Sequence, residues 1–232
     1  MDLELDILVI GAHPDDAEIG CGGTIAHYKK KGKKIGILDL SNGEPTPLGT
    51  IENRIAEAKA ASKILNLDMR ITLDITNRYI ENSIENRIKV SEVIRRYKPK
   101  ILITHPSDDW HPDHIACHQI VKAAKFQAKL TKTDSKYSEH YPKYVFYFDH
   151  SHLKEKDRRV DFLVDISDSI EEKINALKVY KSQFIDNKKH LRIFDYIRER
   201  AGYLGYQIGV KYAEGFISSE FLRLDFEVLD FR

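Results

Sequence analysis

The chain has 232 residues, and its 37 Lys and Arg against 36 Asp and Glu give a formal net charge of +1. This balance, without a basic block, argues against a nucleic-acid partner, because binding to a phosphate backbone requires clustered positive charge. The length suits one α/β domain, so we expect a single domain over residues 1–232.

The N-terminus, MDLELDILVI, contains only a short apolar run. Such a run is too short for a secretory signal or a membrane span, so we expect a cytoplasmic protein with no membrane partner. The cysteines, Cys21 and Cys117, have no CxxC spacing. We interpret both as small core residues rather than as disulfide partners or zinc ligands.

Short apolar runs predict strands, and helix-period segments predict helices between them. The predicted strands are Asp6–Ile10, Ile35–Leu40, Met69–Leu73, Ile101–Thr104, Tyr144–Phe148 and Phe162–Asp165. The predicted helices are Ala17–Lys31, Ile51–Leu65, Ser83–Tyr97, Pro112–Ala128, Glu171–Tyr180 and Tyr196–Tyr206, with a polar loop at 186–193. This alternation predicts an α/β fold with a Rossmann-like, doubly wound, mostly parallel sheet and helices on both faces.

Two polar clusters follow the first and the fourth predicted strands. The first is AHPDDAE, from Ala12, and the second is THPSDDWHPDH, from Thr104 to His114. In a doubly wound sheet of order 3-2-1-4-5, strands one and four are neighbours, and a ligand crevice opens at their carboxyl ends. We therefore expect the two clusters to meet in space.

The residue types in these clusters indicate a metal site. His13 and Asp16 are three residues apart across the predicted strand-to-helix turn, and His114 comes from the start of the helix after strand four. Two imidazoles and one carboxylate suit a catalytic Zn²⁺ site with one position left for water. The same set suits Fe²⁺, so the pattern leaves the metal open. Asp15 would lie within reach of that water as a general base.

Two other interpretations explain parts of this pattern. A lone His-Pro is usually a surface turn, and a lone Asp before a helix is usually an N-cap. Capping requires no histidine, however, so two HPD motifs at the ends of adjacent strands favour chemistry. Dinucleotide binding is disfavoured, because GAHPDDAEIGCGG lacks the GxGxxG spacing and its carboxylates would repel a pyrophosphate.

AHPDDAE and HPDH resemble the LmbE/PIG-L-like N-deacetylases, which act on N-acetylglucosamine groups with a zinc ion on a Rossmann-like fold. TIENRIAEAKAA, VYKSQF and KYAEGFIS look most like the branch that deacetylates N-acetylglucosaminyl malate in bacillithiol biosynthesis. The resemblance implies that the metal is held by His13, Asp16 and His114, with Asp15 as the base, His111 as the oxyanion stabiliser and Asp113 as its partner. It also implies a homo-oligomer, such as a hexamer.

Three further residues are candidates for contacts with substrate. Arg54 could clamp a substrate carboxylate in bidentate fashion, or it could pair with Glu57 on its own helix. Arg78 in TNRYI is retained in a loop that otherwise departs from the relatives. Trp110 occupies a position where the branch often has Arg, and it would pack against the sugar or cover the rim of the crevice. His105 would more often make a single hydrogen bond than act directly.

The expected reaction is hydrolysis of the acetamide of an N-acetylglucosaminyl conjugate, with the L-malate glycoside as the leading candidate. The alternatives are a chitooligosaccharide or an inositol glycoside and, outside enzymes, a sugar- or nucleotide-binding regulator. In the expected mechanism, Asp113 keeps the pKa of His111 above its reference of about 6.5, so that a protonated imidazole meets the oxyanion.

Overall fold

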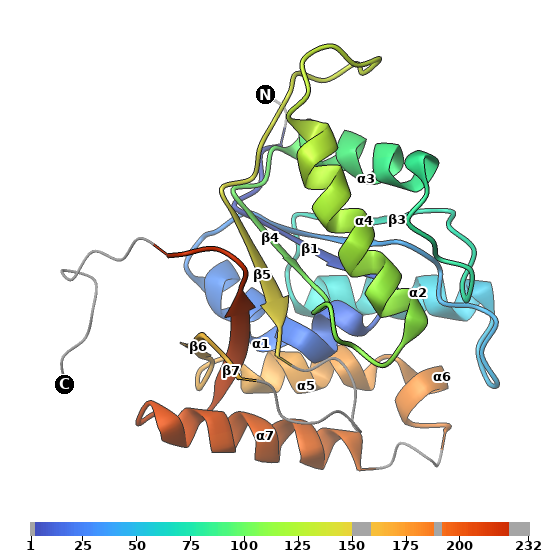
Figure 1. Cartoon of the computed structure of the whole chain (residues 1–232). Coiled ribbons are helices and arrows are strands. Elements are labelled where there is room, and N and C mark those ends of the chain that lie inside the picture. Colours follow the sequence, from blue (N-terminus) through green and yellow to red (C-terminus); the bar gives the residue numbers. More distant parts are fainter. Residues whose placement is uncertain (1–2, 150–158, 188–191, 223–232) are drawn as a thin grey trace.

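The computed structural model describes residues 3–149, 159–187 and 192–222. The sheet has the strand order β3-β2-β1-β4-β5-β7-β6 (Figure 1). Its strands are β1 (Ile7–Gly11), β2 (Ile35–Asp39), β3 (Met69–Thr72), β4 (Ile101–Thr104), β5 (Tyr144–Phe148), β6 (Phe162–Asp165) and β7 (Ala213–Ser218). Strands β1 to β5 pair in parallel, whereas β7 runs antiparallel to both β5 and β6. The predicted α/β class and the order of the first five strands are confirmed.

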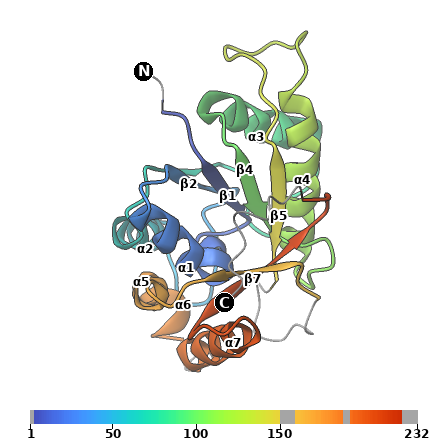
Figure 2. The same ribbon diagram turned by 90° about the vertical axis from the view of Figure 1, so that its left-hand side faces the viewer.

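Helices cover both faces of this sheet (Figures 1 and 2). They are α1 (Asp16–Lys30), α2 (Ile51–Ile64), α3 (Ile84–Tyr97), α4 (Pro112–Ala128), α5 (Ile170–Lys178), α6 (Lys181–Phe184) and α7 (Ile193–Gln207). The apolar side chains of α3 and α4 pack on one face. Those of α1, α2, α5 and α7 pack on the other.

The side-chain alternation of β1 explains its uninterrupted apolar sequence. Ile7 and Val9 belong to the cluster that packs with α1, whereas Leu8 and Ile10 belong to the cluster under α3 and α4. Every residue of the strand is buried. A parallel strand covered on both faces needs apolar side chains at successive positions.

The register of β1 and β4 brings the two polar clusters to the same edge of the sheet. Leu8 pairs with Leu102 and Val9 with Ile103, so both strands end at nearly the same level. The Ala12 N–H then donates a hydrogen bond to Nε2 of His105, 3.2 Å away, just beyond the paired residues. The register of β1 and β4 therefore brings the two polar clusters together, as predicted.

The structure departs from the predicted elements mainly in the last third of the chain. The helix predicted over Glu171–Tyr180 ends at Lys178, because the buried Tyr180 adopts a non-helical ψ of 63° and the separate α6 follows it. Strand β7 was not predicted, because it contains Glu214 and Gly215, and both residue types are uncommon in strands. Part of the loop predicted at 186–193 lies outside the described residues.

The described part of the chain contains no helix with the length and apolarity needed to cross a bilayer. Cys21 and Cys117 are both buried and unbridged, as predicted.

The packing of α1 on the sheet can be tested at Gly20. A Cβ added there would lie 2.5 Å from the ring of Phe148, which is fully buried on β5. We expect Gly20→Ala to lower the free energy of unfolding by about 1–3 kcal/mol, the usual cost of overpacking. Denaturant titration measures it.

Gly202→Ala on α7 is the matched control, because its added Cβ would come no closer than 3.9 Å to Tyr212. We expect it to be neutral or to stabilise the protein by up to about 1 kcal/mol, since alanine favours helices. Equal unfolding midpoints for Gly20→Ala and the wild type would contradict the packing of α1 described here.

Candidate functional site

A cavity of about 240 Å³ lies at the carboxyl ends of the parallel strands and receives side chains from both polar clusters. The described residues that line it are His13, Asp15, Gly43, Pro45, Thr46, Pro47, Arg54, Asn77, Arg78, His111 and Gln183. Another cavity, of about 270 Å³, is lined mainly by apolar side chains, Ile101 and Phe146 among them, and lacks the histidines. The first cavity is therefore the candidate functional site.

The turn between β1 and α1 separates the two adjacent carboxylates. Asp15 is the N-cap residue of α1 and has a φ of 105°, which is rare for a residue with a side chain. Its Oδ2 lies 3.3 Å from Nη1 of Arg54. The carboxylate of Asp16 faces His13 and His114 instead. Backbone strain of this kind occurs where function fixes the direction of a side chain.

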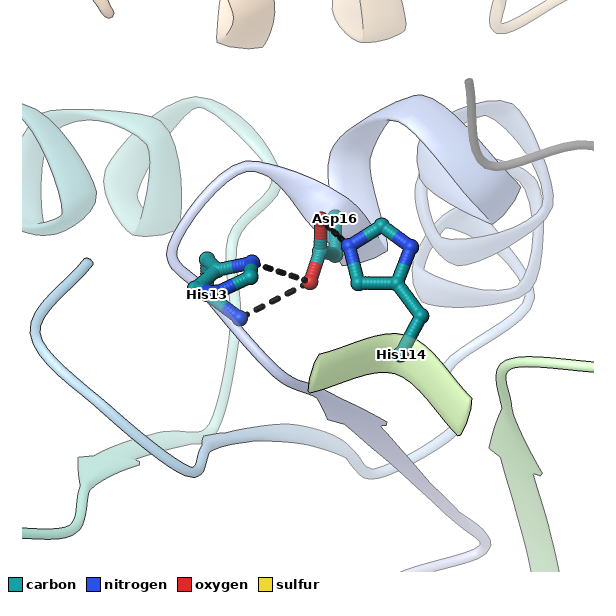
Figure 3. A group of neighbouring side chains, drawn as sticks. All are labelled: His13, Asp16 and His114. Atoms are coloured by element: carbon teal, nitrogen blue, oxygen red, sulfur yellow. Dashed lines mark hydrogen bonds and ion pairs between the residues drawn. The ribbon is translucent and has the colours of Figure 1, made fainter. Parts of the chain in front are cut away.

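His13, Asp16 and His114 converge as a group that could hold a metal ion (Figure 3). Nδ1 of His13 is 3.5 Å from Oδ2 of Asp16, and Nε2 of His114 is 3.4 Å from Oδ1 of Asp16. Ligand atoms about 2.0–2.1 Å from a tetrahedral ion would be separated by roughly 3.3 Å. The donor types and these separations therefore fit a divalent ion such as Zn²⁺ or Fe²⁺, and the identity of the ligands remains a prediction.

The charges of this group are strongly coupled. Burial acts to lower the pKa of His13, but hydrogen bonds to Asp113 and Asp16 overcome it and raise the pKa to about 9. His114 likewise reaches about 10, because Asp16 and Asp109 outweigh the effect of burial on its pKa. The neighbouring imidazoles hold the pKa of Asp16 well below its usual range in spite of burial. Without a metal, the two imidazolium ions are balanced by the carboxylates of Asp16, Asp109 and Asp113.

Asp15 has a different environment from Asp16. Burial raises the pKa of Asp15 to about 7, while the Arg54 guanidinium acts in the opposite direction. A carboxyl group poised near neutrality beside a cavity has the properties of a general acid or base. The geometry is therefore compatible with the predicted role of Asp15, which remains a prediction.

Arg54 lines the cavity but does not pair with Glu57 on its own helix. Its side chain is 2% exposed, and besides Asp15 it donates to the Pro14 carbonyl from Nη2 over 2.5 Å. Glu57, the expected partner on the helix, instead accepts hydrogen bonds from the backbone N–H and the hydroxyl of Ser182. Arg54 is thus held against the strained turn; it also lines the cavity, and its predicted contact with a substrate carboxylate remains a prediction.

The Asp113 carboxylate lies near His111 but makes its side-chain hydrogen bond to His13. Oδ2 of Asp113 lies 3.0 Å from Nε2 of His13 and accepts a hydrogen bond from the backbone N–H of Arg78. Burial, together with the positive charges of His114 and His13, lowers the pKa of His111 to about 4. His111 is therefore neutral at pH 7, because its carboxylate neighbours do not outweigh two nearby cations.

The hydrogen bonds of His111 fix its tautomer. Nδ1 of His111 accepts a hydrogen bond from the backbone N–H of Asp113 over 3.2 Å, which caps the start of α4. A neutral imidazole that accepts at Nδ1 carries its proton at Nε2. Since His111 lines the cavity, it can serve there as a neutral hydrogen-bond donor.

The other candidates for substrate contact differ in position. Arg78 lines the cavity, has a positive φ of 69°, and donates from Nη2 to the Pro45 carbonyl. Trp110 is 57% exposed, and its ring meets that of His111 edge to face with centroids 6.0 Å apart. It is absent from the residues that line the described cavity, so its position is that of a rim residue.

Sequence reasoning gave no role to Asp109 and only a minor one to His105. Both are buried, and Nε2 of His105 lies 3.1 Å from Oδ2 of Asp16. Oδ2 of Asp109 lies 2.9 Å from Nδ1 of His114. The density of His and Asp in THPSDDWHPDH was the available signal, but the partner of each residue depends on the fold.

Three comparisons place the chain among known proteins. The family model PIG-L, described as GlcNAc-PI de-N-acetylase, matches residues 8–125. The diacetylchitobiose deacetylase of Thermococcus kodakarensis is 30% identical, over 94% of this chain and 85% of that protein. A probable N-acetyl-α-D-glucosaminyl L-malate deacetylase 2 of Bacillus subtilis is 26% identical, over 76% and 82%. The structure of the conserved protein TT1542 from Thermus thermophilus has a TM-score of 0.86 at 35% identity, covering 95% of this chain and 97% of that one.

The contact between Arg54 and Asp15 can be tested with a double-mutant cycle at pH 8, where Asp15 is largely ionised. We expect Arg54→Leu to cost about 3–5 kcal/mol of folding free energy, because it leaves a buried carboxylate without its cation. The cost should be clearly smaller in an Asp15→Asn background. Denaturant unfolding of the four proteins gives the coupling energy.

Arg95→Leu is the control for this cycle. Arg95 is also buried, but it donates hydrogen bonds to the carbonyls of Tyr137, Gln127 and Leu130. Its loss should cost the same with either residue at position 15. A coupling energy near zero between Arg54 and Asp15 would show that their contact adds nothing to stability.

Proposed function

The chain belongs to the PIG-L family, and from this premise we propose that it is a metal-dependent deacetylase that hydrolyses the acetamide of N-acetylglucosaminyl conjugates. The observation that carries the proposal is the convergence of His13, Asp16 and His114, with His13 and Asp15 both lining the same cavity. Two imidazoles and a carboxylate form an open metal site, and an adjacent carboxylate of raised pKa supplies a base.

His13, Asp16 and His114 would hold the metal ion, and the ion would supply Lewis-acid polarisation and make a bound water more acidic. Asp15 accepts a proton from the attacking water as the new C–O bond forms. Asp15 then gives this proton to the amide nitrogen, and the C–N bond breaks to release the amine. Water and amide are thereby converted to acetate and a free glucosamine group.

His111 stabilises the charge that develops on the acetyl oxygen through its neutral Nε2–H group. A neutral donor suits this position, because a divalent ion held by His13, Asp16 and His114 would already place positive charge beside His111, and an imidazolium there would be repelled. Donors fixed in place before the reaction stabilise the transition state without reorganisation. Asp113 contributes by holding His13.

The geometry changes which aglycone the site favours. Arg54 was the main residue that supported malate, and it is committed to Asp15 and Pro14. Arg54 and Arg78 both line the cavity, but the contacts of Arg54 with Asp15 and Pro14 leave less of its guanidinium for a substrate carboxylate. We therefore place a neutral saccharide such as diacetylchitobiose ahead of the malate glycoside, a choice that the similarity to the Thermococcus enzyme supports.

A substrate panel tests this proposal directly. The purified protein, loaded with Zn²⁺ or Fe²⁺, should release acetate and a free amine from diacetylchitobiose, N-acetylglucosaminyl malate and the inositol glycoside at different rates. A chelator should abolish the release, and added metal should restore it. Retention of sugar without any release of acetate would instead identify a binding protein.

Asp15→Asn separates the base from the metal site. We expect the variant to keep its metal content and to lose about 10²–10⁴-fold in kcat, because a positioned general base contributes about that much. Metal analysis and turnover on the best substrate of the panel measure the two effects. Near-normal turnover would show that another group accepts the proton of the water.

Metal binding should release protons at neutral pH. In the metal-free protein the pKa values of His13 and His114 are raised to about 9 and 10, so both imidazoles are protonated at pH 7. Since only neutral imidazole binds a metal, roughly two protons should leave per Zn²⁺ bound. The apparent affinity should then keep rising above pH 7, where an ordinary histidine has already lost its proton.

Calorimetric titration in buffers of different ionisation enthalpy measures this proton release. His114→Ala is the control and should release about one proton fewer, with much weaker binding. A wild-type protein that releases none at pH 7 would show that both imidazoles are neutral before the metal arrives.

A further inference from the structure

Asp109 lies in the segment that precedes α4 and connects two parts of the site. It is 3% exposed. Its Oδ1 accepts a hydrogen bond from the backbone N–H of His111 over 2.9 Å, and its Oδ2 lies 2.9 Å from Nδ1 of His114. One carboxylate oxygen of Asp109 therefore binds the backbone at the start of the helix, and the other binds the side chain of a predicted metal ligand.

We propose that Asp109 is a positioning residue that fixes the orientation of the His114 imidazole and thereby sets the affinity of the site for its divalent metal. The inference rests on the metal-dependent function proposed above. Ring stacking alone does not fix this orientation.

Stacking fixes the plane of the His114 ring but not its orientation within that plane. The ring stacks on His105 at 4.0 Å with an angle of 20° and on His111 at 4.6 Å with an angle of 23°. A half-turn of the ring about its bond to Cβ preserves both stacks while it exchanges nitrogen and carbon positions. Directional contacts distinguish the two orientations, and the shorter of the two that His114 makes is that of Nδ1 with Asp109, at 2.9 Å against 3.4 Å for Nε2 with Asp16.

The observed orientation is the one that a metal needs. With the proton of His114 on Nδ1, where Asp109 accepts it, Nε2 keeps its lone pair and lies 3.4 Å from Oδ1 of Asp16. In the other orientation, a C–H group would take the place of Nε2. Asp109 therefore selects both the ring orientation and the tautomer in which His114 can bind a cation together with Asp16.

His13 shows the same arrangement with a different carboxylate. Its Nε2 lies 3.0 Å from Asp113, while its Nδ1 is directed to Asp16 at 3.5 Å. Both imidazoles are thus held by a carboxylate on the nitrogen that faces away from Asp16. Carboxylates in this position orient metal-ligating histidines and increase their basicity, and their loss typically weakens metal binding about 10–100-fold.

Zn²⁺ affinity, measured by competition with a chromophoric chelator, tests the inference without reference to activity. We expect about 10–100-fold weaker binding in Asp109→Ala. Asp109→Asn should bind with intermediate affinity, because its amide oxygen can still accept from Nδ1 but carries no charge. Asp108→Ala is the matched control, since Asp108 is the exposed neighbour in the same segment, and it should bind like the wild type.

Co²⁺ loading distinguishes positioning from a general loss of structure. If Asp109 orients His114, the visible absorption of Co²⁺ should change in Asp109→Ala, while circular dichroism of the metal-free proteins stays alike. In a His114→Ala background, Asp109→Ala should weaken Zn²⁺ binding little further. Should Asp109→Ala not fold, Asp109→Asn carries the same comparison.

The outcomes separate this inference from the function on which it rests. Wild-type Zn²⁺ affinity and a wild-type Co²⁺ spectrum in both Asp109 variants would overturn the role of Asp109 and leave the deacetylase proposal standing. A wild-type protein that binds neither ion would overturn both. Weaker binding confined to the Asp109 variants, with an altered Co²⁺ spectrum, supports the positioning role.

Discussion

Two adjacent carboxylates buried at the end of β1 are the constraint on which the rest of the site depends. Asp15 and Asp16 repel each other, and burial removes the water that would screen them. The positive φ of Asp15 turns the two side chains apart, so that each finds its own positive partner. Asp15 meets Arg54, and Asp16 meets the imidazoles of His13 and His114. The same division gives one carboxylate the position of a base and the other that of a ligand.

The scaffold around Arg54 maintains this separation. Its guanidinium lies over the ring of Tyr180, with Cζ 5.4 Å from the ring centroid. The Tyr180 hydroxyl donates to Glu18, which also accepts from Arg70, and Arg70 in turn makes two hydrogen bonds to Asp39. The buried charges come from α1, β2 and β3, and the Tyr180 hydroxyl comes from the turn before α6. Because each depends on its partner, the position of Arg54 is fixed by several elements together, and not by α2 alone.

The fold and the membership of the site could be predicted because they depend on local patterns. Apolar runs and helical periodicity predicted the parallel strands, and their order brought the two HPD motifs together. The pairing of side chains within the site could not be predicted in this way. Asp113 meets His13 across 100 residues of sequence, and Arg54 meets Asp15 across 39. For a long or a charged side chain, several partners are compatible with the sequence, and the packing of the whole sheet selects one. The protonation state of His111 could not be predicted either, since burial and the positive charges of His114 and His13 lower its pKa to about 4, and the motif alone reveals neither its burial nor its contact with His13.

The two HPD motifs are interlocked, and this explains why neither forms a site alone. Asp113 of the second motif holds His13 of the first, and Asp16 of the first faces His114 of the second. Each motif thus supplies a group that orients or complements a ligand from the other, and the arrangement can form only after β1 and β4 have paired. Asp113 also accepts the backbone N–H of Arg78. The loop that carries Arg78 to the cavity is therefore linked through the Asp113 carboxylate to His13, a predicted metal ligand. Movement of this loop would shift Asp113 and so change the orientation of the His13 imidazole.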